Sequence, residues 1–238
     1  MVIARRDSLK ILAAFAAATA LPGRLHAAKL KPGADSALIV VDVQNCFVTG
    51  GTLPVKQGEE VVPVINKLSK VFKNVVLTQD WHTNGHISFA SSHPGKKPFE
   101  TIELSYGLQV LWPDHCIQGT PDADLHKDLR IPHAELIIRK GYRQHVDSYS
   151  AFLEADRKTM TGLTGYLKER GLKNVYFTGL ATDFCVAWSA LDARRAGFAA
   201  SVIEDATRAI DVDGSLSKAW TDMTAAGVGR VKSSDIAV

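Results

Sequence analysis

The 238-residue sequence contains only three cysteines and has no long charge run, low-complexity tract or internal repeat. Three cysteines are too few for a disulfide scaffold in a chain of this length. An odd number leaves one free thiol, for which Cys185 is the candidate. A Cys46–Cys116 bond would need a Cα separation that the sequence does not establish. With 46% hydrophobic residues and no biased segments, the chain can bury one substantial core, so we expect a single domain over residues 28–238.

Long apolar runs are also missing, apart from a short one near the N-terminus. Arg5 and Arg6 precede apolar residues 11–21, and residues 25–27 offer a small-residue cleavage site. This pattern predicts a cleavable twin-arginine-type signal peptide over residues 1–27. The protein is then expected to be periplasmic, with no stable membrane association after cleavage. A membrane anchor is the alternative, but the run is short for ~30 Å of hydrocarbon.

Outside residues 1–27, the chain has no excess of positive or negative side chains. Of 28 basic and 25 acidic residues, four basic and one acidic lie in residues 1–27, which leaves 24 of each. A domain without net charge gives no electrostatic reason to expect a nucleic-acid partner. The sequence leaves the oligomeric state open, a homo-oligomer included.

Apolar runs and helical patterns alternate along the rest of the chain. Buried strands are expected at residues 37–41, 75–77, 136–138, 175–177 and 200–203, with a weaker strand near 228–231. Helices are expected at residues 60–72, 158–170, 183–196 and 215–226. This alternation predicts a three-layer α/β/α fold with a central, mainly parallel sheet of about six strands.

Polar residues follow several predicted strands, where parallel α/β sheets bind ligands. Asp42, Lys140 and Cys185 follow the first, third and fourth strands. Cys185 lies in the first turn of a predicted helix, whose dipole favours a thiolate and whose free N–H groups can hold an oxyanion. The three side chains predict a nucleophile with a base, and Lys140 is expected to lower the pKa of Asp42. Taken singly, Asp42 is equally well explained as a loop cap and Lys140 as a surface lysine.

A second group of polar residues lies at the start of the insertion at residues 81–135 and within it. This insertion is expected to form the pocket wall. Asp80 and His82 are two residues apart, so in an extended segment their side chains point the same way. Together with His115 they suit one divalent metal ion, Zn²⁺, Fe²⁺ or Mn²⁺. A lone loop histidine is more often a surface residue, but clustering favours a metal site here. His86 is left open between a metal ligand and a hydrogen-bond partner of the ligands.

Three aromatic residues, Phe47, Trp112 and Tyr149, are expected near the mouth of this pocket. Core packing is their default explanation. A flat aromatic substrate would nevertheless need such walls.

Taken together, these segments resemble the nicotinamidases of the isochorismatase-like cysteine hydrolase superfamily, which have a Rossmann-like topology. The matching segments, in family order, are Val40–Asn45, Asp80–His82, His86–Phe89, Trp112–Thr120, Lys140–Gly141 and Gly179–Val186. They cover nearly all of the chain from Ala37 onward. The metal-binding motifs separate nicotinamidases from superfamily members that lack metal.

The resemblance also implies a role for each candidate residue. The catalytic triad would be Asp42, Lys140 and Cys185, and the metal ligands Asp80, His82 and His115, with His86 matching a position that ligates metal in some members only. Backbone N–H groups of Ala181 and Cys185 would form the oxyanion hole, with a cis peptide bond before Ala181. The ring pocket would be lined by Phe47, Trp112 and Tyr149.

The activity implied by this resemblance is metal-dependent hydrolysis of nicotinamide to nicotinate and ammonia through a thioester, with pyrazinamide as a further substrate. One alternative is an amidase for another small amide. Another is an exported binding protein that retains the pocket without turnover. The chain departs from most relatives in carrying a predicted export signal, since those relatives are cytosolic.

Overall fold

The computed structural model describes residues 29–237. The predicted signal, residues 1–27, lies outside the described residues. Six strands form a parallel sheet in the order β5-β2-β1-β6-β7-β8. Their bounds are Ser36–Val41 (β1), Asn74–Asp80 (β2), Leu136–Lys140 (β5), Asn174–Leu180 (β6), Ala199–Arg208 (β7) and Gly229–Val231 (β8). A separate antiparallel hairpin consists of Thr101–Leu104 (β3) and Gly107–Val110 (β4).

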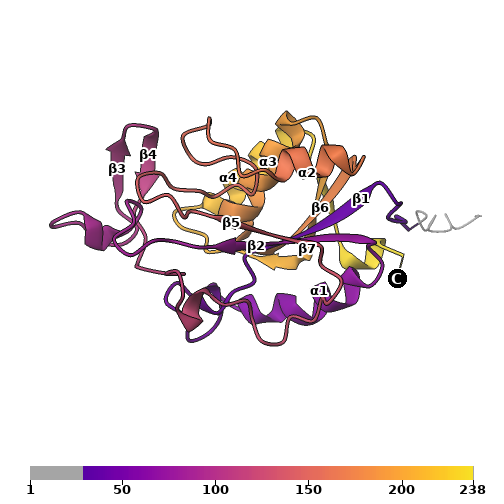
Figure 1. The fold of residues 1–238 in the computed structure, drawn as a ribbon, viewed down its shortest axis with the longest axis horizontal. Helices are drawn as coiled ribbons and strands as arrows, with labels where there is room; N and C mark the ends of the chain where they lie inside the picture. Colours follow the sequence, from indigo (N-terminus) through magenta and orange to yellow (C-terminus); the bar gives the residue numbers. More distant parts are fainter. Residues whose placement is uncertain (1–28, 238) are drawn as a thin grey trace, which may run out of the picture.

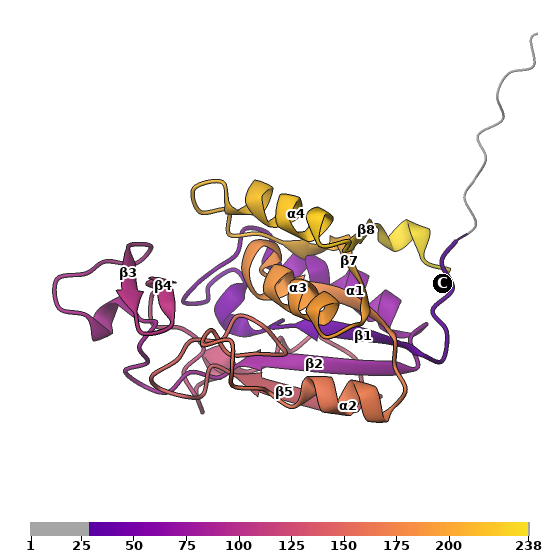
Figure 2. The ribbon, with the colours of Figure 1, turned by 90° about the horizontal axis from the view of Figure 1, so that it is seen from above.

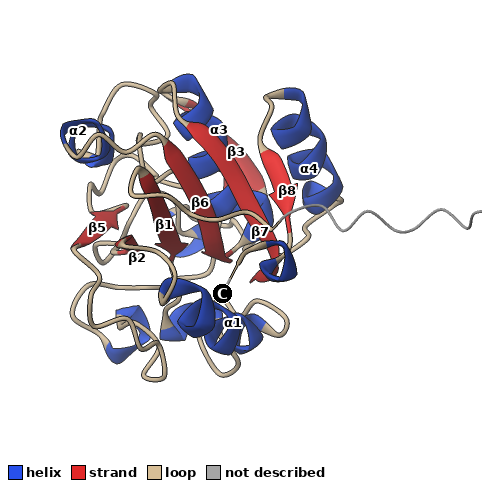
Figure 3. Cartoon of the chain, turned by 90° about the vertical axis from the view of Figure 1, so that its right-hand side faces the viewer, coloured by secondary structure: helices blue, strands red, loops and turns tan. Residues whose placement is uncertain are grey.

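Helices cover both faces of the sheet (Figure 1, Figure 3). The α-helices span Val61–Ser69 (α1), Leu163–Glu169 (α2), Ala187–Arg195 (α3) and Ser215–Ala225 (α4). The alternating side chains of β1 show the division into layers: Leu38 and Val40 pack in a core with α1, and Ile39 packs in a second core with α2, α3 and α4. Short 3₁₀ turns occur at Asn45–Phe47 (η1), Gly58–Glu60, Ala90–Ser92, Pro121–Ala123 and Ser233–Asp235.

The predicted three-layer fold is confirmed, and three of its predicted elements differ in detail. The helix expected from residue 158 begins at Leu163, because Asp156 accepts hydrogen bonds from the N–H groups of residues 158 and 159 and holds them in a turn. The helix expected from residue 183 opens as a π-helical turn, Thr182–Val186 (η5). The third strand, β5, is an edge strand rather than a buried one, so Ile137 is 47% exposed.

The strand order positions the site at the carboxyl ends of β1, β2, β5 and β6. The chain runs outward from β1 to β2 and β5, and then crosses back to β6 on the other side of β1. Ligand crevices of open α/β sheets lie at such a switch point. At Gly179, with φ of +104°, a Cβ atom would lie 1.9 Å from the Val41 oxygen, so only glycine allows β6 to approach β1 this closely.

The insertion between β2 and β5 contains the β3–β4 hairpin, which was not predicted. The hairpin stands apart from the sheet, beyond the strand ends (Figure 1, Figure 2). Its strands are four residues each and largely solvent-facing, so they lack the apolar run that marks a buried strand. Within residues 29–237, none of the helices has the length and apolar character needed to cross a membrane.

Candidate active site

Asp42 directly follows β1 and is completely buried, with φ of +45°. Its N–H donates to Thr78 Oγ1 at 3.0 Å, and the Thr78 hydroxyl donates to Asp42 Oδ1 at 2.5 Å. Its other oxygen lies 2.8 Å from Nζ of Lys140. Burial raises the pKa of the Asp42 carboxyl, and the Lys140 charge offsets this only in part. Lys140 thus lowers this pKa as expected, but burial is the larger effect and leaves the pKa raised.

Lys140 is the last residue of β5, and its whole side chain is buried. Its ammonium lies 2.8 Å from oxygens of both Asp42 and Asp80, and donates to the Ser148 carbonyl at 3.1 Å and Cys185 Sγ at 3.4 Å. Burial opposes its charge, but the two carboxylates raise the pKa of Lys140 well above its usual range. The alternative of a surface lysine is wrong.

Cys185 lies in η5 and is the free cysteine of the chain, 5% exposed. Its sulfur and single carboxylate oxygens of Asp42 and Asp80 all lie within 4.8 Å of one another. Burial raises the pKa of the Cys185 thiol well above its usual value, and Lys140 opposes the rise without cancelling it. Lys140 thus favours the thiolate, as expected, but burial is the larger effect. The Leu180–Ala181 peptide bond before η5 is cis, as the resemblance implied.

Asp80, His82 and His115 meet beside this group. Nε2 of His82 lies 3.2 Å, and Nε2 of His115 lies 3.4 Å, from Oδ2 of Asp80. Each Nδ1 faces a backbone carbonyl, that of Gly141 at 3.0 Å and that of Pro113 at 2.8 Å. Donation of Nδ1–H to carbonyls leaves both Nε2 lone pairs directed at the same point, which is the usual arrangement of metal-bound histidines. These three residues therefore fit a divalent metal ion.

The backbone and the charges around these residues also favour metal binding. Gly141 has φ of +67°, and a Cβ atom there would lie 2.6 Å from the His82 ring, so glycine leaves the ring its room. Burial opposes ionisation of Asp80, but the charge that His82 carries when no metal ion occupies its Nε2, together with the charge of Lys140, holds the pKa of Asp80 well below the usual value. Asp80 is thus an anion, as a metal ligand must be.

His86 is buried beside His82, with ring centroids 4.3 Å apart, but both of its nitrogens already have protein partners. Nε2 faces the Arg143 carbonyl at 3.0 Å, and Nδ1 lies 2.7 Å from Ser88 Oγ. A carbonyl only accepts, so Nε2 carries the proton and Nδ1 accepts from the serine. Burial, assisted by the charge of His82, lowers the pKa of His86 to about 4. The sequence left His86 open between a metal ligand and a hydrogen-bond partner near the ligands. This geometry favours the hydrogen-bonding role.

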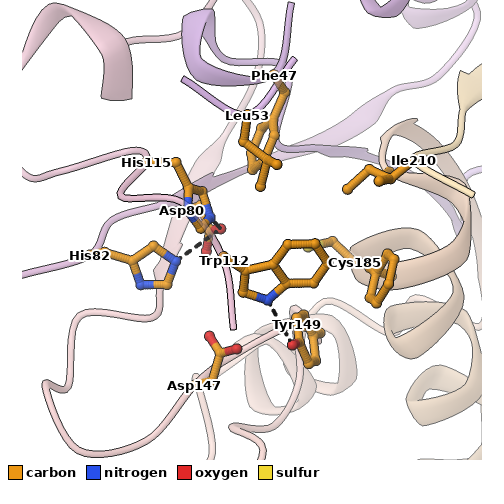
Figure 4. Close-up of a pocket in the computed structure, with 12 residues that line it drawn as sticks. Phe47, Leu53, Asp80, His82, Trp112, His115, Asp147, Tyr149, Cys185 and Ile210 are labelled. Carbon is orange, nitrogen blue, oxygen red and sulfur yellow. Dashed lines mark hydrogen bonds and ion pairs between the residues drawn. The ribbon is translucent and has the colours of Figure 1, made fainter. Parts of the chain in front are cut away.

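A pocket opens above the thiol, and Figure 4 shows the residues that line it. The three aromatic residues expected at this pocket are among its lining residues. The same lining includes the Cys185 thiol and the three candidate metal ligands. The full lining is Phe47, Leu53, Asp80, His82, Trp112, His115, Asp147, Tyr149, Ala181, Phe184, Cys185 and Ile210.

The hairpin is joined to this pocket through one buried side chain, Gln109 of β4. Its amide donates to Asp147 Oδ2 at 2.7 Å and to Tyr149 Oη at 3.0 Å. Trp112 Nε1 donates to the same Tyr149 oxygen at 2.9 Å. Sequence reasoning missed Gln109, Asp147 and Thr78, because each contact joins segments at least 36 residues apart.

The fold and the site together define a cysteine hydrolase built on a three-layer α/β/α sheet. A buried thiol, a carboxylate and an ammonium lie at the switch point of a parallel sheet, where a substrate acyl group can reach them. An aspartate and two histidines flank them.

Comparisons with known proteins agree with this class. An isochorismatase domain matches residues 36–235. The chain is 58% identical over 210 residues to the nicotinamidase of Acinetobacter baylyi, a match covering 88% of this chain and 98% of that protein. A solved structure of a nicotinamidase and pyrazinamidase of Acinetobacter baumanii gives a TM-score of 0.85 at 64% identity, covering 85% of this chain and 98% of the other. The chain therefore belongs to the isochorismatase family, among the amide hydrolases of nicotinamidase type.

Two further structures are informative about ligands. PnC1 of L. infantum, in complex with nicotinate, has a TM-score of 0.77 at 38% identity, covering 88% of this chain and 98% of that chain. The pyrazinamidase of Pyrococcus horikoshii, in complex with zinc, has a TM-score of 0.68 at 33% identity, covering 83% and 99%.

Proposed function

We propose that this chain hydrolyses nicotinamide to nicotinate and ammonia, and accepts pyrazinamide by the same route. The observation that carries the proposal is the meeting of Cys185 Sγ, the Lys140 ammonium and the Asp42 carboxylate beside a pocket walled by aromatic rings. The nicotinamidase relatives and the nicotinate complex of the L. infantum protein support this choice of substrate.

We propose Asp80, His82 and His115 as the ligands of one divalent ion, Zn²⁺, Fe²⁺ or Mn²⁺. Their convergent Nε2 and Oδ2 atoms support this, as does the zinc complex of the P. horikoshii relative. When bound, such an ion supplies an electrophilic anchor for the ring nitrogen of the substrate. The ligand set does not choose between these metals, because Asp and His sites accept several of them.

The first half of the reaction forms a thioester. Because burial raises the pKa of the Cys185 thiol, Asp42 accepts the thiol proton as the sulfur attacks the amide carbon. We assign the oxyanion to the N–H groups of Ala181 and Cys185; loss of one such donor typically costs ~2.7–4 kcal/mol. Asp42 then returns the proton to the departing nitrogen, the C–N bond breaks, and ammonia leaves. Lys140 stays charged throughout and balances the carboxylates on either side of it.

The second half of the reaction regenerates the thiol. A water molecule gives a proton to Asp42 and attacks the thioester carbon, again with the oxyanion facing the two N–H groups. The C–S bond breaks and the sulfur takes the proton back from Asp42. The product leaves as nicotinic acid and becomes nicotinate by losing its proton to the solvent, where ammonia takes it up. A raised pKa for both Asp42 and Cys185 suits a proton that passes repeatedly between them.

Ammonia release by the metal-loaded protein tests the proposal, with nicotinamide and benzamide as matched substrates. Benzamide has the same carboxamide but lacks the ring nitrogen, so we expect turnover of nicotinamide to be much faster. Equal rates would replace this assignment with a general small-amide hydrolase. Binding of nicotinamide without ammonia release would instead favour an exported binding protein.

We also propose that residues 1–27 direct export to the periplasm. The paired arginines and the following apolar run support this. The Cys46–Cys116 disulfide also supports it, because structural disulfides persist mainly in oxidising compartments. Cell fractionation of the full chain and of a variant with Arg5 and Arg6 replaced by lysine tests this; equal distribution of both in the cytosol would contradict it.

A further inference from the structure

Cys46 and Cys116, which are 70 residues apart in sequence, form a disulfide inside the domain. Their Cα atoms are 5.6 Å apart and both residues are completely buried. The disulfide takes no part in the proposed reaction. Its position next to the pocket nevertheless connects it with the metal site.

Each half of the disulfide adjoins residues of the site. Cys46 lies in η1 next to Phe47, and its carbonyl accepts the N–H of Leu53 at 3.0 Å, so it supports two pocket-lining residues. Cys116 directly follows His115, and its carbonyl accepts the N–H of His82 at 3.1 Å. The bond therefore joins one wall of the pocket to the His115 segment, which is itself hydrogen-bonded to the His82 segment.

The Cys116 sulfur also lies close to two of the three proposed metal ligands. Cys116 Sγ, a nitrogen of His115 and a carboxylate oxygen of Asp80 are all within 4.8 Å of one another. A free thiolate at that distance is a soft ligand that Zn²⁺ accepts readily and Mn²⁺ does not favour. In the disulfide, the same sulfur is committed to Cys46.

We propose that the Cys46–Cys116 disulfide determines which metal the site selects and how tightly it binds. It withholds the Cys116 thiolate from the ligand set and holds the His115 segment against the pocket wall. The bond forms by thiol–disulfide exchange with a disulfide oxidant, which takes up two electrons and two protons as the Sγ–Sγ bond is made. The inference rests on the proposed metal site of Asp80, His82 and His115.

The two segments have further links, so the bond can be removed without separating them. Asn45 Nδ2 donates to the Pro121 carbonyl at 2.8 Å, and Thr52 Oγ1 donates to Asp122 at 2.6 Å. Both links are solvent-exposed and lie outside the pocket. Variants that lack the disulfide therefore keep two links between the segments, and their unfolding temperatures show whether the domain is still folded.

Metal binding distinguishes the two parts of the proposal. Cys46→Ser frees the Cys116 thiol, whereas Cys46→Ser/Cys116→Ser removes both sulfurs and is the matched control. Each protein is prepared metal-free and titrated with Co²⁺, whose thiolate complexes absorb strongly in the near ultraviolet. Affinities for Zn²⁺ and Mn²⁺ are then measured by competition with a chelator, and unfolding temperatures are recorded beside them. Cys185 is present in all three proteins, so its contribution to the Co²⁺ spectrum is common to them.

We expect the thiolate-to-cobalt absorption to be stronger in Cys46→Ser than in the other two proteins. The ratio of Zn²⁺ to Mn²⁺ affinity should rise at least tenfold in Cys46→Ser and stay at the wild-type value in the double variant. Both metals should bind the double variant about tenfold more weakly, as is usual when support of a metal ligand is lost. Wild-type spectra and ratios in Cys46→Ser, with unchanged affinities in the double variant, would overturn the proposal.

Two further results keep the proposal falsifiable. If a variant does not fold, the wild-type protein is reduced with a phosphine, and the same Co²⁺ spectrum and Zn²⁺/Mn²⁺ ratio are expected as for Cys46→Ser; an unchanged spectrum contradicts the inference. If the oxidised wild-type protein binds none of these metals, the metal site itself is wrong and the inference falls with it. Binding by the wild type without any effect of the disulfide rejects only the inference.

Discussion

Lys140 and Asp80 are register partners at the carboxyl ends of β5 and β2, and their side chains form an ion pair of 2.8 Å. The other oxygen of Asp80 faces Nε2 of His82 at 3.2 Å and Nε2 of His115 at 3.4 Å. Asp80 therefore contacts the two histidines on one side and, on the other, the Lys140 ammonium that donates to Cys185. A change in either is transmitted to the other through this one carboxylate.

Replacement of Lys140 by methionine should both destabilise the protein and remove its activity. The change leaves Asp42 and Asp80 buried beside each other without a positive partner, and breaking a buried pair in this way costs about 3–5 kcal/mol. Urea unfolding of the metal-free protein and ammonia release measure the two effects. Lys97→Met, at an exposed position, is the control and should change neither. Unfolding of Lys140→Met at the wild-type urea concentration would show that the ion pairs contribute no stability.

Thr78→Val should shift the acid side of the pH–rate profile upward. The hydroxyl donates to Asp42 Oδ1, a contact that lowers the pKa of this carboxyl, so its removal raises the pKa further. Asp42 must be ionised to accept the thiol proton, and the pH at which kcat/KM falls to half should therefore rise. Thr178→Val is the matched control, because Thr178 is also buried in a strand but its hydroxyl faces the Ile39 carbonyl. Identical pH–rate profiles for both variants would show that the Thr78 hydroxyl does not set the pKa of Asp42.

His86→Ala and His115→Ala should differ in metal content. Both nitrogens of His86 have protein partners, whereas Nε2 of His115 is directed at Asp80. We expect His115→Ala to lose bound metal on dialysis, and His86→Ala to retain it with affinity reduced no more than about 100-fold, as for an outer partner of a ligand. Metal analysis and chelator competition measure both. Complete loss of metal from His86→Ala would make His86 a direct ligand.

Alkylation of Cys185 in the metal-free protein should be slow at neutral pH and accelerate as the pH rises. Burial raises the pKa of this thiol well above its usual value, so the reactive thiolate increases about tenfold per pH unit across the neutral and mildly alkaline range. Iodoacetamide rates between pH 6 and about pH 9, read by mass spectrometry, test this. Cys185→Ala should remain unlabelled, since the other two cysteines are joined. A rate that is already constant at pH 7 would mean that the thiol is ionised at rest.

Removal of the Cys46–Cys116 bond should lower the free energy of unfolding by about 4 kcal/mol, the value that chain entropy gives for a loop of this length. The measurement is urea unfolding of the Cys185→Ala variant with and without a reductant, so that the active-site thiol plays no part. A difference below about 1 kcal/mol would show that the unfolded chain gains little freedom from reduction.

The strands and their polar ends could be predicted because each depends on local sequence. Runs such as residues 37–41 mark strands buried on both faces, and parallel strands bring the residues that follow them to one edge. For this reason the sequence alone was enough to place the group of Asp42, Lys140 and Cys185 and the group that begins at Asp80 at the same edge of the sheet. The π-helical form of η5 could not be predicted, because it depends on how the turn packs against the sheet.

The electrostatics of the site could not be predicted for a related reason. Whether Lys140 or burial determines the pKa of Asp42 depends on how completely water is excluded, and the sequence does not show this. The Lys140–Asp80 pair likewise depends on the register between β2 and β5, which are separated by the whole insertion. Two groups that look independent in the sequence are thus joined in the structure.

The position of the Cys46–Cys116 bond has a practical consequence for anyone who purifies this protein. Two samples of the mature domain, one made in a reducing cytosol and one recovered from an oxidising compartment, would have the same mass to within two hydrogens, but on the proposal above they would load different ions from the same medium. Laboratories that express one gene in different hosts would then report different native metals, and each report would be correct for its own preparation.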